Sequence, residues 1–247
     1  MDVKPSMGMS EYNRDQWEAI QMVQYQLGTF STGQTGRLRG RIGPYLQFRN
    51  EVEDFQKQHF SEVCTEKCFT SQTSACCGRE GIATFFADVV MNLLLSGKEE
   101  VEGLLERLSK DTGGLKCVYL GKKGCLWRLK PIVCEMFLCE HARETVLGKD
   151  ELLRDQWEKL RQREKRYTWP SSPVLFDDLE EMFIRAGLDS PLMYFHRSPG
   201  LLRVKAGYIK NRSKRPASAP LVPVEKGSLY PDRSHDHGSG GSKGQTI

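Results

Sequence analysis

Long hydrophobic runs are scarce in this chain of 247 residues. The longest apolar stretch, residues 82–95, is interrupted by Thr84, Asp88 and Asn92, whereas a membrane span needs roughly 20 consecutive apolar residues. The chain starts Met-Asp-Val-Lys, and no apolar segment of the kind that defines a secretory signal follows. We therefore expect a cytoplasmic protein with no membrane partner.

Familiar catalytic motifs are also missing. The chain has no Gly-x-Ser-x-Gly, no His-Glu-x-x-His and no dinucleotide-binding fingerprint. Its five histidines form no pattern that would pair a base with a cysteine nucleophile. The glycine-rich segment 28–43 is not closed by Gly-Lys-Ser/Thr as a phosphate loop is, and we expect it to be a flexible connector. Whether the protein is an enzyme stays open at this point.

Most of the chain has no excess of one charge. Residues 205–247 contain eight basic and three acidic residues, and the rest of the chain contains 28 basic and 29 acidic ones. A balanced body does not favour a nucleic-acid partner. The segment beyond Ala206 is rich in Pro, Ser, Gly and charge, which predicts a disordered basic tail over residues 205–247.

Cysteine is absent from the first 63 and the last 108 residues, so all eight cysteines cluster in between. They are Cys64, Cys68, Cys76, Cys77, Cys117, Cys125, Cys134 and Cys139. An even count could mean disulfides, but these belong to secreted chains, and clustered thiols in a reducing compartment are more often metal ligands or redox centres. We therefore predict that the eight cysteines form a metal site.

The cysteine spacing bears on which metal is bound. The first group reads C-x3-C-x7-C-C and the second C-x7-C-x8-C-x4-C. No C-x2-C knuckle of a zinc finger is present, and neither of the common ferredoxin spacings fits. Iron or an iron–sulfur cluster is slightly favoured for this reason, and zinc stays open.

Two further predictions concern individual residues near the cluster. Adjacent Cys76 and Cys77 precede an apolar helical stretch, and a helix N-terminus would favour their thiolates. His141 is the best candidate ligand other than cysteine. His59 is interpreted as a helix-surface residue.

The order of the cysteine motifs resembles a known family. The motifs are Cys64-Thr-Glu-Lys-Cys68, Cys76-Cys77-Gly, and Cys117-Val-Tyr-Leu-Gly-Lys-Lys-Gly-Cys125-Leu-Trp-Arg-Leu-Lys-Pro131-Ile-Val-Cys134. Over roughly residues 60–142 this order is similar to the zinc- or iron-chelating domain family, also called CxxCxxCC or YkgJ-like. That family usually has C-x2-C-x2-C-C and an arginine before the proline, where this chain has longer gaps and Lys130.

The resemblance implies a bound metal ion or cluster and leaves any protein partner unknown. Members of the family look like small bacterial metal- or cluster-binding proteins, and one branch is associated with lysine methylation of flagellin. The primary hypothesis is therefore a metal- or iron–sulfur-cluster-binding protein with a structural or electron-handling role. The alternatives are a cluster-dependent protein-modifying enzyme, such as a lysine N-methylase, and a disulfide-stapled interaction module.

The hydrophobic pattern predicts a mainly α protein with a small β-hairpin, in which helices wrap a cysteine-rich metal-binding core. Helices are expected over 14–27, from Pro44 to about 60, 83–96, 98–110, from Pro131, 149–166 and 175–187. The hairpin is expected from strands over 117–120 and 125–129. Residues 191–202 are apolar enough to pack back on the body. The expected domains are 1–43 (a helix and the connector), 44–204 (the metal-binding domain) and 205–247 (the tail).

Overall fold

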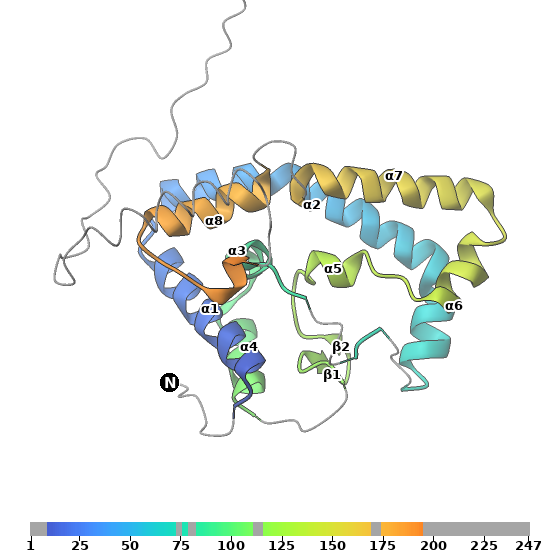
Figure 1. Ribbon diagram of the computed structural model, residues 1–247, viewed down its shortest axis with the longest axis horizontal. Helices are drawn as coiled ribbons and strands as arrows, with labels where there is room; N and C mark the ends of the chain where they lie inside the picture. The colour runs from blue at the N-terminus through green and yellow to red at the C-terminus, as the bar shows by residue number, and fades with distance from the viewer. Residues whose placement is uncertain (1–8, 73–75, 79–82, 111–115, 169–173, 195–247) are drawn as a thin grey trace, which may run out of the picture. The chain divides into compact units, whose positions relative to one another are not determined.

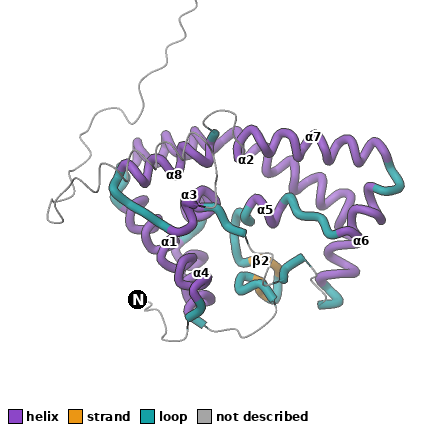
Figure 2. The backbone as a smooth tube through the Cα atoms, in the orientation of Figure 1, coloured by secondary structure: helices purple, strands orange, loops and turns teal. Residues whose placement is uncertain are grey.

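Helices dominate the computed structural model, which describes residues 9–72, 76–78, 83–110, 116–168 and 174–194 (Figures 1 and 2). The main helices are α1 (Glu11–Gly28), α2 (Thr32–Phe60), α3 (Phe86–Leu95), α4 (Lys98–Ser109), α7 (Glu151–Thr168) and α8 (Leu175–Arg185). Shorter helical segments are η1 (Ser61–Phe69), α5 (Ile132–Glu135), α6 (Glu140–Ala142), η3 (Arg143–Leu147) and η4 (Pro191–Tyr194). Strands β1 (Leu120–Gly121) and β2 (Gly124–Cys125) pair as an antiparallel hairpin. The prediction of a mainly α protein with a small hairpin is confirmed.

Helix α3 lies at the centre of the hydrophobic core. It contacts α1, α8 and η4, while α1 also packs on α4. Residues 86–94 of this helix are all buried, including Asp88 and Asn92. A helix that is apolar on every side must be enclosed by other elements, so the apolar stretch around residues 82–95 is explained by a central position in the core.

Aromatic side chains join α2 to α7 and α8. The ring of Tyr45 lies 5.1 Å from that of Tyr167 and 5.7 Å from that of Phe176, centroid to centroid. Further along α2, the rings of Phe55 and Trp157 stack at 5.8 Å. Offset and edge-to-face aromatic pairs at such separations add to the stabilisation from burial, so these contacts fix α7 and α8 along α2.

The predicted flexible connector over residues 28–43 is wrong as local structure, because α2 runs unbroken from Thr32 to Phe60. The Ser31 side chain accepts a hydrogen bond from the Gln34 N–H, and the Gln34 side chain bonds back to Ser31, which makes a capping box. Leu38 and Ile42 are buried in the core. Their burial and the cap outweigh the cost of roughly 1 kcal/mol for each helical glycine. A boundary between residues 43 and 44 would fall inside this helix.

The other predicted helices are confirmed to within a few residues at their ends. The apolar packing of the chain after Pro191 is confirmed for Leu192 and Met193, which are fully buried. The remainder of that segment and the predicted tail over 205–247 lie outside the described residues. Among the residues that are described, no helix combines the length and apolar character required to cross a membrane.

Candidate metal centre

A main-chain contact joins the two cysteine-bearing halves of the sequence. The N–H of Cys117 donates a hydrogen bond to the carbonyl of Cys77 at 2.8 Å. Gly78 and Lys116, next to these cysteines, form an isolated antiparallel bridge. A short extended pairing of this kind fixes the register of the two segments. The main chains of Cys77 and Cys117 therefore lie side by side, although the two residues are distant in the sequence.

The β-hairpin then determines the position of Cys125. Its register pairs Leu120 with Cys125 and Gly121 with Gly124. Gly124 has a φ of +116°, a backbone conformation that residues other than glycine rarely adopt. Cys125 faces Leu120 rather than Cys117, so the two cysteines are not at matched ends of the strands. The strands are also shorter than predicted, because only two residues of each are paired.

Two aromatic side chains anchor the hairpin in the core. Tyr119 and Trp127 are buried, and their rings meet edge to face with centroids 5.3 Å apart. The Tyr119 hydroxyl donates a hydrogen bond to Oε1 of Gln16, a fully buried residue of α1, at 3.1 Å. Buried hydroxyl groups require such a partner, and this bond ties the cysteine-bearing hairpin to α1.

Cys77, Cys117 and Cys134 each have other cysteines near enough for a thiolate there to raise their pKa. Burial raises the pKa of Cys117 to about 11 and that of Cys134 to about 12, and neighbouring cysteines add to both shifts. Burial also raises the pKa of Cys125. Thiols with raised pKa values are protonated near neutral pH, so a metal must displace their protons to bind.

Cys64 belongs to a second group of neighbours. Burial raises its pKa to about 11, with contributions from Cys76, Cys139 and Cys68. Cys64 and Cys68 lie on η1, a π-helical continuation of α2, and π-helical segments occur frequently at functional sites. Cys139 caps α6, where its sulfur accepts a hydrogen bond from the Ala142 N–H at 3.4 Å.

The adjacent pair connects the two groups. The Cys76 thiol donates a hydrogen bond to the Cys77 sulfur, which lowers the pKa of Cys77 and raises that of Cys76. The prediction that the pair starts a helix is wrong: Cys76 lies in a turn and Cys77 in a bend, and α3 begins only at Phe86. The glycine that follows the pair forms an antiparallel bridge with Lys116 instead.

The cysteines of the described residues do not form a coordination sphere. All eight are free thiols. Within the described ranges, no three histidine, cysteine or acidic side chains are arranged to hold a metal ion. The predicted cysteine-rich metal-binding core is thus not shown as a formed site. His141 is exposed on α6, and His59 lies against the ring of Phe55 at 4.8 Å.

Some polar residues beside the cluster were not identified from the sequence as part of a site. Tyr12 of α1 lies within electrostatic influence of Cys117, Cys134 and Cys125. Asp88 and Asn92 were interpreted only as interruptions of an apolar stretch. Asp88 and Asn92 are spaced i, i+4, which places two polar groups on one face of an otherwise apolar helix. This spacing could have identified them as residues with a polar role.

Comparison with known proteins finds no relative for this chain. No family model matches it, and no curated protein or solved structure does either. The resemblance to the zinc- or iron-chelating family therefore stays a prediction that rests on the cysteine motifs.

Proposed function

We propose that this protein binds a metal ion or an iron–sulfur cluster through its cysteine thiolates, in a structural or electron-handling role. Iron or an iron–sulfur cluster is the favoured occupant, and zinc is the alternative. The eight cysteines are the candidate ligands, and the reducing cytoplasm is the compartment in which such thiols persist. The observation that carries the proposal is the 2.8 Å hydrogen bond between Cys117 N–H and Cys77 C=O.

That bond matters because it holds together two cysteine-bearing segments that are distant in the sequence. Cys77 and Cys117 are far apart in sequence, and closing a loop of that length is unfavourable in an unfolded chain. The folded chain has already closed it, and the hairpin adds Cys125 nearby.

The donor chemistry fits the proposed occupants. Thiolates are soft ligands that favour zinc, copper(I) and iron–sulfur clusters over magnesium or calcium. All eight sulfurs are reduced, so each is available once its proton is lost. Since burial raises the pKa of Cys64, Cys117 and Cys134, metal affinity should increase as the pH rises.

Anaerobic purification followed by elemental analysis and visible absorption spectroscopy tests the proposal. A brown protein that contains iron and acid-labile sulfide supports a cluster, whereas a colourless protein with stoichiometric zinc supports a zinc site. Failure of the reduced full-length protein to retain or take up iron, zinc or a reconstituted cluster would refute the proposal.

A pair of variants on α5 identifies a ligand. Replacing Cys134 with serine should abolish or strongly reduce metal content. Val133→Ala is the matched control, because Val133 is the preceding residue, is exposed and carries no donor atom. Unchanged metal content in Cys134→Ser would show that Cys134 is not a ligand.

A further inference from the structure

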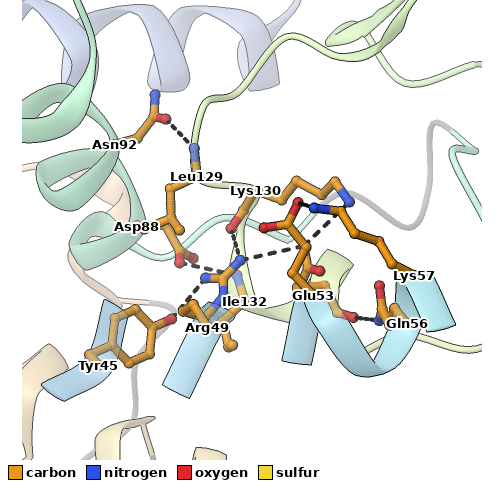
Figure 3. A network of polar contacts seen from close by, with 11 residues as sticks. Tyr45, Arg49, Glu53, Gln56, Lys57, Asp88, Asn92, Leu129, Lys130 and Ile132 are labelled. Atoms are coloured by element: carbon orange, nitrogen blue, oxygen red, sulfur yellow. Dashed lines mark hydrogen bonds and ion pairs between the residues drawn. The ribbon is translucent and has the colours of Figure 1, made fainter. Parts of the chain in front are cut away.

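A short arc of chain, residues 129–135, follows the hairpin and contains the α5 cysteine. Side chains from α2 and α3 bind its main chain (Figure 3). Cys125 lies just before the arc and Cys134 lies within it. Pro131, in the middle of the arc, has no N–H to donate. The two helices bind four other main-chain groups of this arc.

Helix α3 binds the arc through Asn92 and Asp88. Oδ1 of Asn92 accepts a hydrogen bond from the Leu129 N–H at 2.9 Å. One turn earlier, Oδ1 of Asp88 accepts the Ile132 N–H at 3.1 Å. The second carboxylate oxygen of Asp88 accepts the Phe85 N–H at 3.1 Å, which fixes the carboxylate at the start of α3.

Helix α2 binds the same arc from another direction. The Arg49 guanidinium donates to the carbonyl of Lys130 at 2.8 Å and to the hydroxyl of Tyr45 at 3.0 Å. The side-chain amide of Gln56 donates to the carbonyl of Glu135. Arg49 and Gln56 are seven residues apart, so both lie on the same face of α2 (Figure 3).

The burial of these side chains distinguishes this arrangement from ordinary surface hydrogen bonding. Asp88, Asn92 and Arg49 expose only 1%, 0% and 4% of their area. Polar groups this deeply buried are costly unless they are hydrogen-bonded, and each of the three makes a hydrogen bond to a main-chain group of the arc. The arc therefore has one strongly preferred conformation, which the core imposes on it.

We infer that Asn92, Asp88 and Arg49 are positioning residues that set the separation and orientation of the Cys125 and Cys134 thiols. The part of this inference that concerns metal rests on the proposed function. None of the three residues is itself a ligand. Each acts through the backbone of residues 129–132, in the way that hydrogen-bonding partners behind metal ligands tune affinity in other proteins.

Substitution of Asn92 separates positioning from a general contribution to stability. Asn92→Leu has nearly the same shape and removes the acceptor for the Leu129 N–H, whereas Asn92→Asp retains an Oδ1 acceptor. Val90→Ala is the matched control, since Val90 is a fully buried residue of the same helix with an apolar side chain. Asn92→Ala serves as a second acceptor-free variant if Asn92→Leu does not fold.

Cobalt(II) titration of the reduced full-length protein provides the first measurement, because its absorption reports both affinity and the geometry of thiolate coordination. We expect Asn92→Leu to weaken cobalt(II) binding by roughly 10- to 100-fold relative to Val90→Ala and to alter the shape of the absorption bands. Asn92→Asp should restore both. If Asn92→Leu and Val90→Ala give the same affinity and the same bands, the inference is overturned.

Amide hydrogen exchange of the metal-free protein provides a readout that does not depend on metal binding. Asn92→Leu should selectively increase exchange at the Leu129 N–H and leave the Ile132 N–H protected. Unchanged protection of Leu129 would overturn the inference whatever the metal result. A wild-type protein that binds no cobalt(II), zinc or iron would refute the proposed function, while the exchange data would still decide whether Asn92 fixes the arc.

Discussion

The guanidinium of Arg49 lies 3.5 Å from the carboxylate of Glu135, and the two side chains expose only 4% and 5% of their area. This ion pair joins α2 to α5 at the residue that follows Cys134. Lys130 adds a second cation 3.4 Å from the same carboxylate. Because desolvation opposes the attraction between buried charges, the pair is expected to matter less for total stability than for the arrangement of the elements that it connects.

Removing one member of this pair should be strongly destabilising. We expect Arg49→Met to lower the free energy of unfolding by about 3–5 kcal/mol, because the buried Glu135 carboxylate loses its buried counter-charge and keeps only the half-exposed Lys130. Urea denaturation followed by circular dichroism measures the change. The double variant Arg49→Met/Glu135→Met should recover much of the loss, since the buried Glu135 carboxylate is then removed together with its partner.

An exposed ion pair is the control for this experiment. Arg161 and Glu158 form a pair at 3.0 Å on α7 and are each about half exposed. Arg161→Met should change the free energy of unfolding by about 1 kcal/mol or less. Equal effects of Arg49→Met and Arg161→Met would contradict the buried character of the Arg49–Glu135 pair.

Asp88 should make stability depend on pH. Burial raises its pKa from the ordinary value of 3.8 to about 7 in the folded protein. The folded state therefore binds a proton more tightly than the unfolded state, and the stability from this group is complete below about pH 4 and is lost as the pH rises to about 7. At about 1.4 kcal/mol per pH unit, the loss is on the order of 4 kcal/mol.

Urea denaturation between pH 4 and pH 7.5 measures this dependence. Asp88→Asn, which cannot ionise, should show a flatter stability profile than the wild type across that range. Parallel profiles for the two proteins would show that Asp88 does not titrate there.

Glycine substitutions test whether residues 32–43 are helical. Gly40 is exposed within α2, and an added Cβ would meet no atom within 4 Å. Gly40→Ala should therefore raise the free energy of unfolding by roughly 0.5–1 kcal/mol, as alanine favours the helix and restricts the unfolded chain. A flexible connector at this position would show no such increase.

Gly124→Ala provides the opposite case in the hairpin. Its φ of +116° is strained for alanine, and the expected destabilisation is about 1–3 kcal/mol. Thermal unfolding of both variants and the wild type measures the contrast. A neutral Gly124→Ala variant would contradict the hairpin geometry.

The metal-free thiols should differ in reactivity. The hydrogen bond from Cys76 lowers the pKa of Cys77, whereas burial raises that of Cys117 to about 11. Both residues are partly exposed, so the thiolate fraction should decide the rate. At pH 8, iodoacetamide should label Cys77 roughly tenfold faster than Cys117 or more, as measured by mass spectrometry. In the urea-unfolded control, Cys77 and Cys117 should be labelled at equal rates. Equal labelling rates in the folded protein as well would contradict the predicted order.

Periodicity along the chain was sufficient to predict most of the helices. Trp17, Ile20 and Val23 recur on one face of α1, and all three are buried. The glycine-rich segment before Pro44 was misinterpreted, because local propensity does not register the burial of Leu38 and Ile42 against distant parts of the chain. A weak local preference was overridden by tertiary packing.

The candidate site was predictable in composition but not in arrangement. Clustering of the cysteines and the absence of an alternative catalytic motif were visible in the residues alone. The pairing of Gly78 with Lys116 and the offset of Cys125 from Cys117 depend on backbone registers, which no local pattern specifies.

The composition and order of the residues thus established a helical protein with eight thiols concentrated in one part of the chain. The folded chain placed the main chains of Cys77 and Cys117 side by side. It also bonded Asp88, Asn92 and Arg49 to the main chain of residues 129–132. The physical reason is the sequence separation of the contacts. Helical periodicity arises from contacts within a few residues, whereas the hydrogen bonds that hold the arc join residues 37 to 81 positions apart.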